Sequence, residues 1–406
     1  PEQEHFITSL YQNRLNGSTN PLFLTKTSRH TDDQTDEDIY LAIRLLRKDS
    51  EGKVKMKDYA VIGLPTAELG RFIRLPDSEG KTYLMFLDDV IRYCLPMIFI
   101  GMNYTDYEAY TFKFTKDAEM EIDSDLRTGV LQKISKGIKS RKRGEPIRFV
   151  YDKEMPKDLL RKLTDRLNVD KNDTRVAGGR YHNFKDLMKF PKVRPDLLYA
   201  PQRPIQHPSI SLFSSILEVI ARRDIFLNYP YHTFQHFIDF LREAAIDPRV
   251  ESIYITLYRT AEHSKVINAL VNAVKNGKKV YAMLELKARF DEEQNMENTD
   301  LLQREGVKIL HTMEDLKVHS KVVLVERRER RGMKRYAYIG TGNFNENTAL
   351  IYSDFGLFTS HDEITEDVLN VFLFLSNNHK QFTFKHLMVS PYYMRMQFVD
   401  MIDREI

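Results

Sequence analysis

Alternating apolar and polar positions along the chain predict two regions with different arrangements of strands and helices. Residues 1–204 carry short strand-like runs separated by turn residues, with a helical pattern at 87–95, which is typical of an α+β domain. In residues 205–387, strand and helix patterns follow one another in turn, for example at 252–259 and 264–275. This alternation predicts an α/β domain with a mostly parallel mixed sheet flanked by helices.

The individual elements follow from the two side-chain periods, two residues for strands and 3.6 for helices. The predicted strands are 38–46, 59–65, 71–76, 81–86, 107–115, 146–151, 252–259, 279–286, 307–311, 318–325 and 354–358. The predicted helices are 6–11, 87–95, 123–140, 157–167, 232–245, 264–275, 291–303, 366–375 and 394–402. Five prolines between positions 191 and 208 predict the linker between the two domains.

One predicted strand, 318–325, is apolar and β-branched enough to be buried, yet it contains His319 and Lys321. A period of two places both side chains on the same face. Burying an imidazole and an ammonium without partners is costly, so the pair indicates an anion, a cleft or both. A neutral histidine is a competent nucleophile toward phosphorus, and a neighbouring lysine offsets charge on phosphoryl oxygens. The alternative is a core histidine satisfied by its neighbours.

A glycine-containing turn at 340–343 follows that strand along the chain. Its small residues let backbone N–H groups approach an anion, and Asn343 adds an amide side chain that could bind phosphate. A second H-x-K triplet, at 263–265, opens a helical pattern, and we interpret it as a solvated first helical turn. We interpret His182 as structural.

Three further residues stand beside predicted strand ends. Arg259 ends one strand, Arg289 lies just past another, and Tyr352 leads into a third. Because ligands gather at the carboxyl ends of strands in open α/β sheets, we expect these side chains to converge with His319. Guanidinium groups match phosphate oxygens, so the two arginines predict a phosphate clamp.

The composition and charge of the chain restrict the classes of function that it can have. A net charge of +3 with a pI near 8.6 permits a polyanionic partner but is not a nucleic-acid signature. Cys94 is the only cysteine, which excludes an intramolecular disulfide and fits a reducing, cytoplasmic compartment. The most apolar window, 83–102, is interrupted by charged residues and cannot span a membrane. The basic stretch 136–143 is either a solvated helix end or a guide for a polyanion.

Several sequence motifs follow one another in order along the chain: ITLYR at 255–259, LELKARFDE at 284–292, VHSK at 318–321, GTGNFN at 340–345, IYSD at 351–354 and VSP at 389–391. With these motifs the chain resembles the long-chain polyphosphate kinases, enzymes built on phospholipase D-like domains. The resemblance is strong over 224–406 and looser over 123–203.

This resemblance implies that ATP and a growing inorganic polyphosphate chain exchange a terminal phosphoryl group reversibly, through a phosphohistidine and with Mg²⁺. It implies that His319 is the nucleophile, that Lys321 stabilises the phosphoryl oxygens and that Tyr352 borders the nucleotide. It places Arg259 and Arg289 at the phosphates of the Mg²⁺-nucleotide. Because a cationic arginine cannot ligate Mg²⁺, we assign both to phosphate oxygens, with no protein ligand for the metal. It further implies a homo-oligomer in the full-length enzyme and is compatible with peripheral membrane association.

By the same resemblance, 1–204 is the middle domain, 205–387 the first phospholipase D-like catalytic domain, and 388–406 the start of a truncated second one. We therefore expect a partner histidine beyond Ile406 and little activity from this chain alone. One alternative function is a phospholipase D-type phosphodiesterase, because Glu326 stands five residues after Lys321, where that enzyme class has a carboxylate. Another is a non-catalytic polyanion-binding module.

Overall fold

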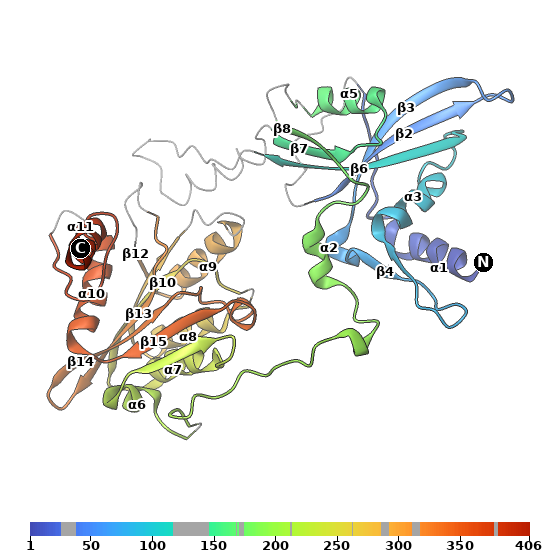
Figure 1. Cartoon of the computed structure of the whole chain (residues 1–406). Helices are drawn as coiled ribbons and strands as arrows, with labels where there is room; N and C mark the ends of the chain where they lie inside the picture. Colours follow the sequence, from blue (N-terminus) through green and yellow to red (C-terminus); the bar gives the residue numbers. More distant parts are fainter. Residues whose placement is uncertain are drawn as a thin grey trace. The chain divides into compact units, whose positions relative to one another are not determined.

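The computed structural model of the chain divides into two compact units, Pro1–Tyr199 and Ala200–Ile406, which are described separately (Figure 1). The described residues are 1–25, 38–116, 146–167, 169, 174–211, 213–261, 263–285, 292–310, 317–376 and 381–406. Among them, no helix is both long enough and apolar enough to cross a membrane. The predicted helix at 123–140 and the basic stretch 136–143 lie outside the described residues.

The first unit is built on a six-stranded sheet with the order β1-β3-β2-β6-β7-β8. Its strands are β1 (Leu22–Phe23), β2 (Tyr40–Lys48), β3 (Val54–Gly63), β6 (Asp106–Lys116), β7 (Pro146–Asp152) and β8 (Thr174–Gly178), with a separate ribbon of β4 (Phe72–Arg74) and β5 (Leu84–Phe86). Its helices are α1 (Glu2–Leu10), α2 (Thr66–Leu69), α3 (Leu87–Ile98) and α5 (Lys157–Arg166), with short turns at Tyr11–Leu15, Phe184–Lys189 and Pro195–Leu197. All sheet pairings are antiparallel except β7 with β8.

Both faces of this sheet are covered, and β2 shows how. Leu41, Ile43 and Leu45 share a buried cluster with α3, whereas Tyr40 and Ala42 share another with α5. The alternation follows from the two-residue period of a strand. It explains why β2 reads as an almost continuous apolar run, since a strand buried on both faces has no solvent side.

The second unit is built on a seven-stranded sheet with the order β12-β11-β10-β13-β14-β15-β9. Its strands are β9 (Ile225–Tyr229), β10 (Val250–Leu257), β11 (Lys279–Leu284), β12 (Lys308–Leu310), β13 (Lys321–Glu329), β14 (Gly332–Gly340) and β15 (Asp354–Thr359). Its helices are α6 (Ile216–Arg222), α7 (Gln235–Ile246), α8 (Lys265–Lys275), α9 (Glu292–Arg304), α10 (Asp362–Ser376) and α11 (Met394–Glu405), with a short turn at Thr348–Leu350. The predicted fold class, α+β followed by α/β with a mixed sheet flanked by helices, is confirmed.

The expectation that this sheet is mostly parallel is wrong. Only β10–β11 and β11–β12 pair in parallel, joined through α8 and α9, while the other four pairings are antiparallel. The β-α-β alternation ends at β12. After it, β13 and β14 form a hairpin closed by the pair Glu329 and Gly332, which leaves no room for a crossover helix. β9 and β14 were not among the predicted strands, and both add antiparallel pairings.

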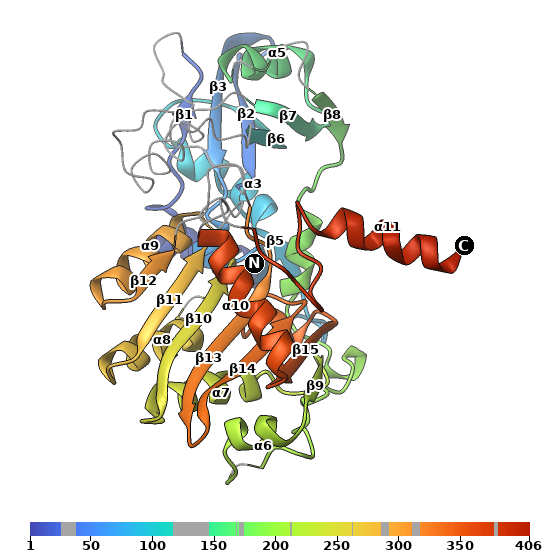
Figure 2. The same ribbon diagram turned by 90° about the vertical axis from the view of Figure 1, so that its left-hand side faces the viewer.

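Helices cover both faces of this second sheet (Figure 2). Phe372 on α10 lies in one cluster with Val322 and Leu324 of β13. On the opposite face, Phe237 on α7 packs against Tyr338 of β14, with ring centroids 4.7 Å apart. The sheet is therefore the middle layer of three. The ends of its strands form two opposite edges of this layer, and the loops at such strand ends can carry a functional site.

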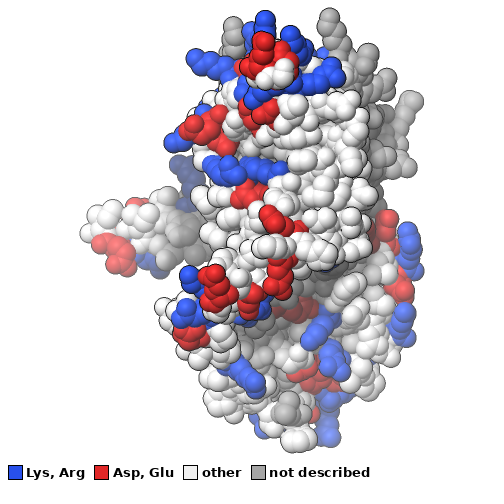
Figure 3. Space-filling model, turned by 90° about the vertical axis from the view of Figure 1, so that its right-hand side faces the viewer, with Lys and Arg blue, Asp and Glu red and all other residues white. Residues whose placement is uncertain are grey.

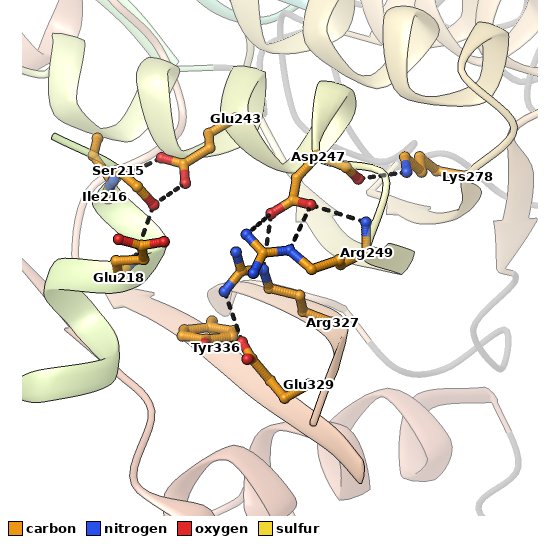
Figure 4. A network of polar contacts seen from close by, with 10 residues as sticks. All are labelled: Ser215, Ile216, Glu218, Glu243, Asp247, Arg249, Lys278, Arg327, Glu329 and Tyr336. Carbon is orange, nitrogen blue, oxygen red and sulfur yellow. Dashed lines mark hydrogen bonds and ion pairs between the residues drawn. The ribbon is translucent and has the colours of Figure 1, made fainter. Parts of the chain in front are cut away.

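One of those edges, the end of β13, is fixed by a network of ion pairs (Figure 4). The side chain of Arg327 is 2% exposed, and its Nε donates to the Asp247 carboxylate at 2.8 Å. Its Nη1 pairs with Glu329 at 2.6 Å, and the Tyr336 hydroxyl donates to the same carboxylate at 2.9 Å. Arg249 adds a second guanidinium on Asp247. This network ties the C-terminus of α7 to the hairpin.

Charged residues of opposite sign are mixed on the face of the molecule drawn in Figure 3. In the first unit, Arg44 lies between Glu108 and Asp158, with N···O distances of 2.6 and 3.0 Å, and Lys57 reaches Asp158 at 2.8 Å. These cations are matched locally by carboxylates. They therefore do not form a single-sign surface for a polyanion.

The predicted domain boundaries, 1–204, 205–387 and 388–406, stay predictions. The second H-x-K triplet does open a helix: Ser264 caps α8, its hydroxyl accepting the Val266 N–H at 3.1 Å, and His263 is exposed just before it. The helix expected at this triplet is present, but it begins at Lys265, and Ser264 is a buried cap rather than part of a solvated first turn. The ring of His182 lies 2.8 Å from the Gly179 carbonyl through Nε2, a local backbone contact.

Candidate functional site

The strand register brings several of the predicted site residues to one edge of the second sheet. Lys321, the first residue of β13, pairs with Gly340, the last residue of β14, and Gly340 pairs in turn with Gly356 near the start of β15. On the other side, Leu257 at the end of β10 pairs with Leu284 at the end of β11. The segments that follow β10, β11 and β14 and those that precede β13 and β15 therefore meet at this edge.

A cluster of an aromatic ring, an imidazole and three cations forms at that edge. The His319 ring meets the Tyr258 ring edge to face, with centroids 4.8 Å apart and planes at 88°. Around the same Tyr258 ring lie Lys321 Nζ at 5.3 Å, Arg259 Cζ at 5.8 Å and Lys317 Nζ at 5.9 Å from its centroid. Cation–π attraction holds these positive groups around the ring. They surround one imidazole with positive charge.

His319 does not lie in the strand predicted for it. β13 begins only at Lys321, and residues 317–320 are not part of a strand. The side chain of His319 is exposed, whereas that of Lys321 is only 6% exposed. The expectation that both point from the same face of one strand is therefore wrong, although the two groups still lie close together.

Side chains replace the missing ladder bonds before β13. The Glu285 carboxylate accepts the Val318 N–H at 2.8 Å, and the Thr256 hydroxyl donates to the Ser320 carbonyl at 2.7 Å. The Lys321 ammonium donates to the His319 carbonyl. With these backbone groups satisfied, the segment can turn out of the sheet without orphaned polar atoms. The turn presents the imidazole of His319 to solvent.

The electrostatics of the cluster favour a neutral imidazole. Although the side chain is exposed, partial desolvation of its ring lowers the pKa of His319, and the nearby Lys321, Lys317 and Arg259 lower it further. Burial also lowers the pKa of Lys321 to about 8, with the Asp354 carboxylate acting in the opposite direction. At neutral pH the site thus combines an uncharged nitrogen nucleophile with charged neighbours.

The turn at 340–343 packs tightly against β15. Thr341 Oγ1 donates to Asp354 Oδ1 at 2.7 Å and accepts the Phe355 N–H at 2.9 Å. A Cβ on Gly342 would stand 2.5 Å from Asp354 Oδ2, so a larger residue there would have to displace the Asp354 side chain. Asn343 follows, half-buried, and its Oδ1 accepts no hydrogen bond from the described residues. The unused hydrogen-bonding capacity of this amide is therefore that of an acceptor.

The other predicted residues divide into three cases. Tyr352 lies just before β15 at the same edge and is 61% exposed, so it can border a ligand. Arg289 lies outside the described residues. Glu326 lies five residues along β13 from Lys321, about 16 Å at the strand rise. Its carboxylate accepts from Ser252 at 2.7 Å and from Arg335 at 3.1 Å.

Sequence reasoning missed the residues that organise the cluster. Tyr258 and Lys317 flank predicted residues in the chain, and Asp354 opens the strand after Tyr352, but none was assigned a role. Asn295 on α9 donates from its amide to the carbonyls of Tyr258 and Glu285, both at 2.9 Å. Only Glu285 could have been recognised from the sequence, because a carboxylate inside an apolar run needs a polar partner.

The opposite end of the sheet holds a pocket of about 830 Å³ beside the Arg327 network. Its lining is rich in cations from the β13–β14 hairpin, including Arg328, Arg330 and Arg331. The lining residues include no histidine or cysteine, so this pocket offers positive charge to an anion but no nucleophile of the kind found at His319. We therefore take the His319 edge as the candidate active site.

Comparisons with known proteins agree with one another. Two family models match, the polyphosphate kinase middle domain over residues 2–190 and the polyphosphate kinase C-terminal domain 1 over residues 215–381. The polyphosphate kinases of Vibrio parahaemolyticus and Escherichia coli K12 are 40% and 37% identical to the chain over its whole length. The chain spans 58% and 59% of those relatives. The crystal structure of the Porphyromonas gingivalis polyphosphate kinase matches all of this chain and 60% of its own, with 30% identity and a TM-score of 0.74.

Proposed function

Because this chain belongs to the polyphosphate kinase family, we propose that in the full-length protein it carries the nucleophile that transfers the terminal phosphate of ATP to inorganic polyphosphate, reversibly, through a phosphohistidine at His319. The observation that supports this most is the edge-on contact of His319 with Tyr258 inside a ring of three cations. Loose phosphoryl transfer requires positioning and charge neutralisation more than elaborate covalent chemistry. The cluster offers both.

The proposed reaction has two displacements. In the first, a ring nitrogen of neutral His319 attacks the terminal phosphorus of ATP, a P–N bond forms, the P–O bond to the β-phosphate breaks and ADP leaves. In the second, a terminal oxygen of polyphosphate attacks the same phosphorus, the P–N bond breaks and the chain is longer by one phosphate. Lys321, Lys317 and Arg259 offset the negative charge of the transferred group in both steps.

Other residues support this nucleophile. Tyr258 fixes the plane of the imidazole, and Glu285 holds the backbone of the segment that carries it. We assign Tyr352 to the border of the nucleotide because it is exposed at the same edge, and Asn343 to phosphate because its amide N–H groups can donate to phosphate oxygens. Arg289 remains a proposed phosphate ligand on sequence grounds alone.

Mg²⁺ would be held by phosphate oxygens rather than by this chain. Apart from Tyr258, the described side chains around His319 are cationic, and the Asp354 and Glu285 carboxylates accept hydrogen bonds from Thr341 and Val318. They do not form an oxygen cage for a free ion. Carried by the nucleotide, Mg²⁺ supplies charge neutralisation on the phosphates.

The second candidate function is phosphodiester hydrolysis of the phospholipase D type, because His319 and Lys321 would serve that chemistry equally well. The position of Glu326 argues against a direct role for its carboxylate, since Arg335 and Ser252 occupy it. A direct comparison separates the two functions. Full-length protein should elongate polyphosphate from ATP and leave a chromogenic phosphodiester intact without nucleotide. Diester hydrolysis without chain elongation would overturn the proposal.

The ionisation of Lys321 predicts the alkaline side of the pH profile. The ammonium is charged below its pKa of about 8 and loses its charge above it, so kcat/KM should fall as the pH rises through that region. The acidic side should lie below the ordinary range of histidine, because the lowered pKa keeps His319 neutral there. In Lys321→Arg the cation stays charged, so the alkaline fall should move to higher pH. An unchanged alkaline limb in that variant would exclude Lys321 as its source.

A further inference from the structure

Two histidines and a glutamate come together at the other end of β15 from the candidate active site. His361 and Glu363 lie where α10 begins, and His386 lies in the segment before α11. One ligand atom from each residue lies within 4.8 Å of the other two. β15 begins beside the active-site turn at Asp354 and ends at Thr359, so this group belongs to the opposite edge of the sheet.

The three side chains already lie against one another. His386 Nε2 is 2.9 Å from Glu363 Oε2, and the two imidazole centroids are 5.5 Å apart with planes at 82°. A tetrahedral ion with bonds of ~2.0–2.1 Å places its ligand atoms about 3.3 Å from one another. Small rotations of exposed side chains therefore suffice to close the group around an ion.

The backbone that carries the histidines is fixed from both sides. The Asp367 carboxylate, 2% exposed, accepts the N–H groups of residues 385–387 at distances from 2.7 to 3.1 Å. The His361 N–H donates to the Thr359 hydroxyl at 3.0 Å, and its carbonyl accepts the Thr365 N–H at 2.9 Å. Holding ligands in place before binding lowers the entropy cost of capturing an ion.

Lys385 forms an ion pair with the other carboxylate oxygen of Glu363. Its ammonium lies 2.8 Å from Glu363 Oε1, which leaves Oε2 for an ion beside His386. Like any glutamate in contact with solvent, Glu363 is ionised at neutral pH. A hydrogen-bonded partner on the outer oxygen is the usual companion of a ligating carboxylate. The positive charge of Lys385 weakens binding of a dication, so we expect micromolar rather than nanomolar affinity.

We propose that His361, Glu363 and His386 form a binding site for a borderline transition-metal dication of the Zn²⁺ class, with a water in the fourth position. Two imidazoles and one carboxylate suit Zn²⁺, Co²⁺ and Ni²⁺, whereas Mg²⁺ prefers oxygen ligands alone. The ion would join the start of α10 to residues 385–387. The site does not depend on the proposed phosphotransfer, and its ligands lie outside that cluster.

Titration of the metal-free full-length protein with Co²⁺, followed by its visible absorption, tests the site. We expect one Co²⁺ to bind with the intense absorption of a four-coordinate ion and to be displaced by Zn²⁺. Loss of an outer-shell partner costs about 10–100-fold in affinity, so removing a ligand in His386→Ala or Glu363→Gln should cost at least about 100-fold. The matched control His5→Ala removes an exposed histidine on α1 and should bind as the parent does.

Two further measurements distinguish loss of the metal site from misfolding of the variant. Circular dichroism of His386→Ala should match the parent, because the exposed side chain is not part of a core. Saturating Zn²⁺ should raise the melting temperature of the parent but not of His386→Ala, since an ion that binds only the folded state stabilises it. Parent protein that binds no more Co²⁺ than the folded His386→Ala variant would overturn the proposal.

Discussion

Replacing His319 by asparagine in the full-length protein should lower the rate of phosphate transfer from ATP to polyphosphate by roughly 10⁴-fold or more. Asparagine keeps a planar polar side chain of similar reach but has no nucleophilic nitrogen. The proposed P–N bond cannot form, and no other described imidazole lies in the Tyr258 ring contact. The measurement is the initial rate of chain elongation at saturating ATP and polyphosphate.

The chain supplies a matched control for this change. His263 stands in the same His-Ser-Lys sequence, but it precedes α8 and adopts a left-handed φ of 56°. Asparagine tolerates that conformation, so His263→Asn tests an identical local sequence without backbone strain. Its rate should stay close to that of the parent. A His319→Asn protein as fast as His263→Asn would remove His319 from the reaction.

Removing the guanidinium of Arg259 should have the second largest effect, a loss of about 10²–10³ in kcat/KM for ATP. Arg259 is one of the three cations around Tyr258 and one of the charges that lower the pKa of His319. Arg259→Ala should therefore also raise the pH at which the acidic limb of the profile falls, because a positive neighbour of the imidazole is gone.

Arg259→Lys separates charge from shape. The lysine keeps the positive charge but not the planar fork that can contact two phosphate oxygens, so it should recover only part of the activity. Arg242→Ala on α7, where the arginine is exposed and 3.9 Å from Asp239, is the control and should behave as the parent does. Equal kcat/KM for Arg259→Ala and Arg242→Ala would contradict the assignment.

Local periodicity was sufficient to predict most elements of both units. β2 shows why: its alternate residues enter two different cores, so its first seven positions are apolar except for Arg44, and the pattern needs no long-range information. Boundaries moved by a few residues, as for α10, because helix ends depend on capping contacts. β14 was missed because the first half of the strand, with Lys334 and Arg335, is polar.

The direction of the strands was harder to predict from the sequence than their positions. Alternating strands and helices predict parallel neighbours, which holds for β10, β11 and β12. β13 instead enters the sheet on the other side of β10 and runs antiparallel to it. That position depends on which edge remains open once the first strands have paired, and single-sequence patterns do not contain this information.

The candidate site was predictable in composition but not in geometry. His319, Lys321 and Arg259 were identified because histidine, lysine and arginine are residue types that suit phosphoryl transfer. The departure of His319 from β13 depends on Glu285, which is distant in the chain and takes the Val318 N–H. Tyr258 could not be identified as the centre of the cluster, because a tyrosine at a strand end is equally well explained by packing.

The chemical form of phosphate on the protein decides whether His319 is the nucleophile. After brief incubation of the full-length protein with ATP labelled in its terminal phosphate, denaturation and peptide mapping, we expect acid-labile, base-stable label on the imidazole of His319, which added polyphosphate removes. Label on another residue, or chain elongation with no protein-bound phosphate at any time, would contradict it.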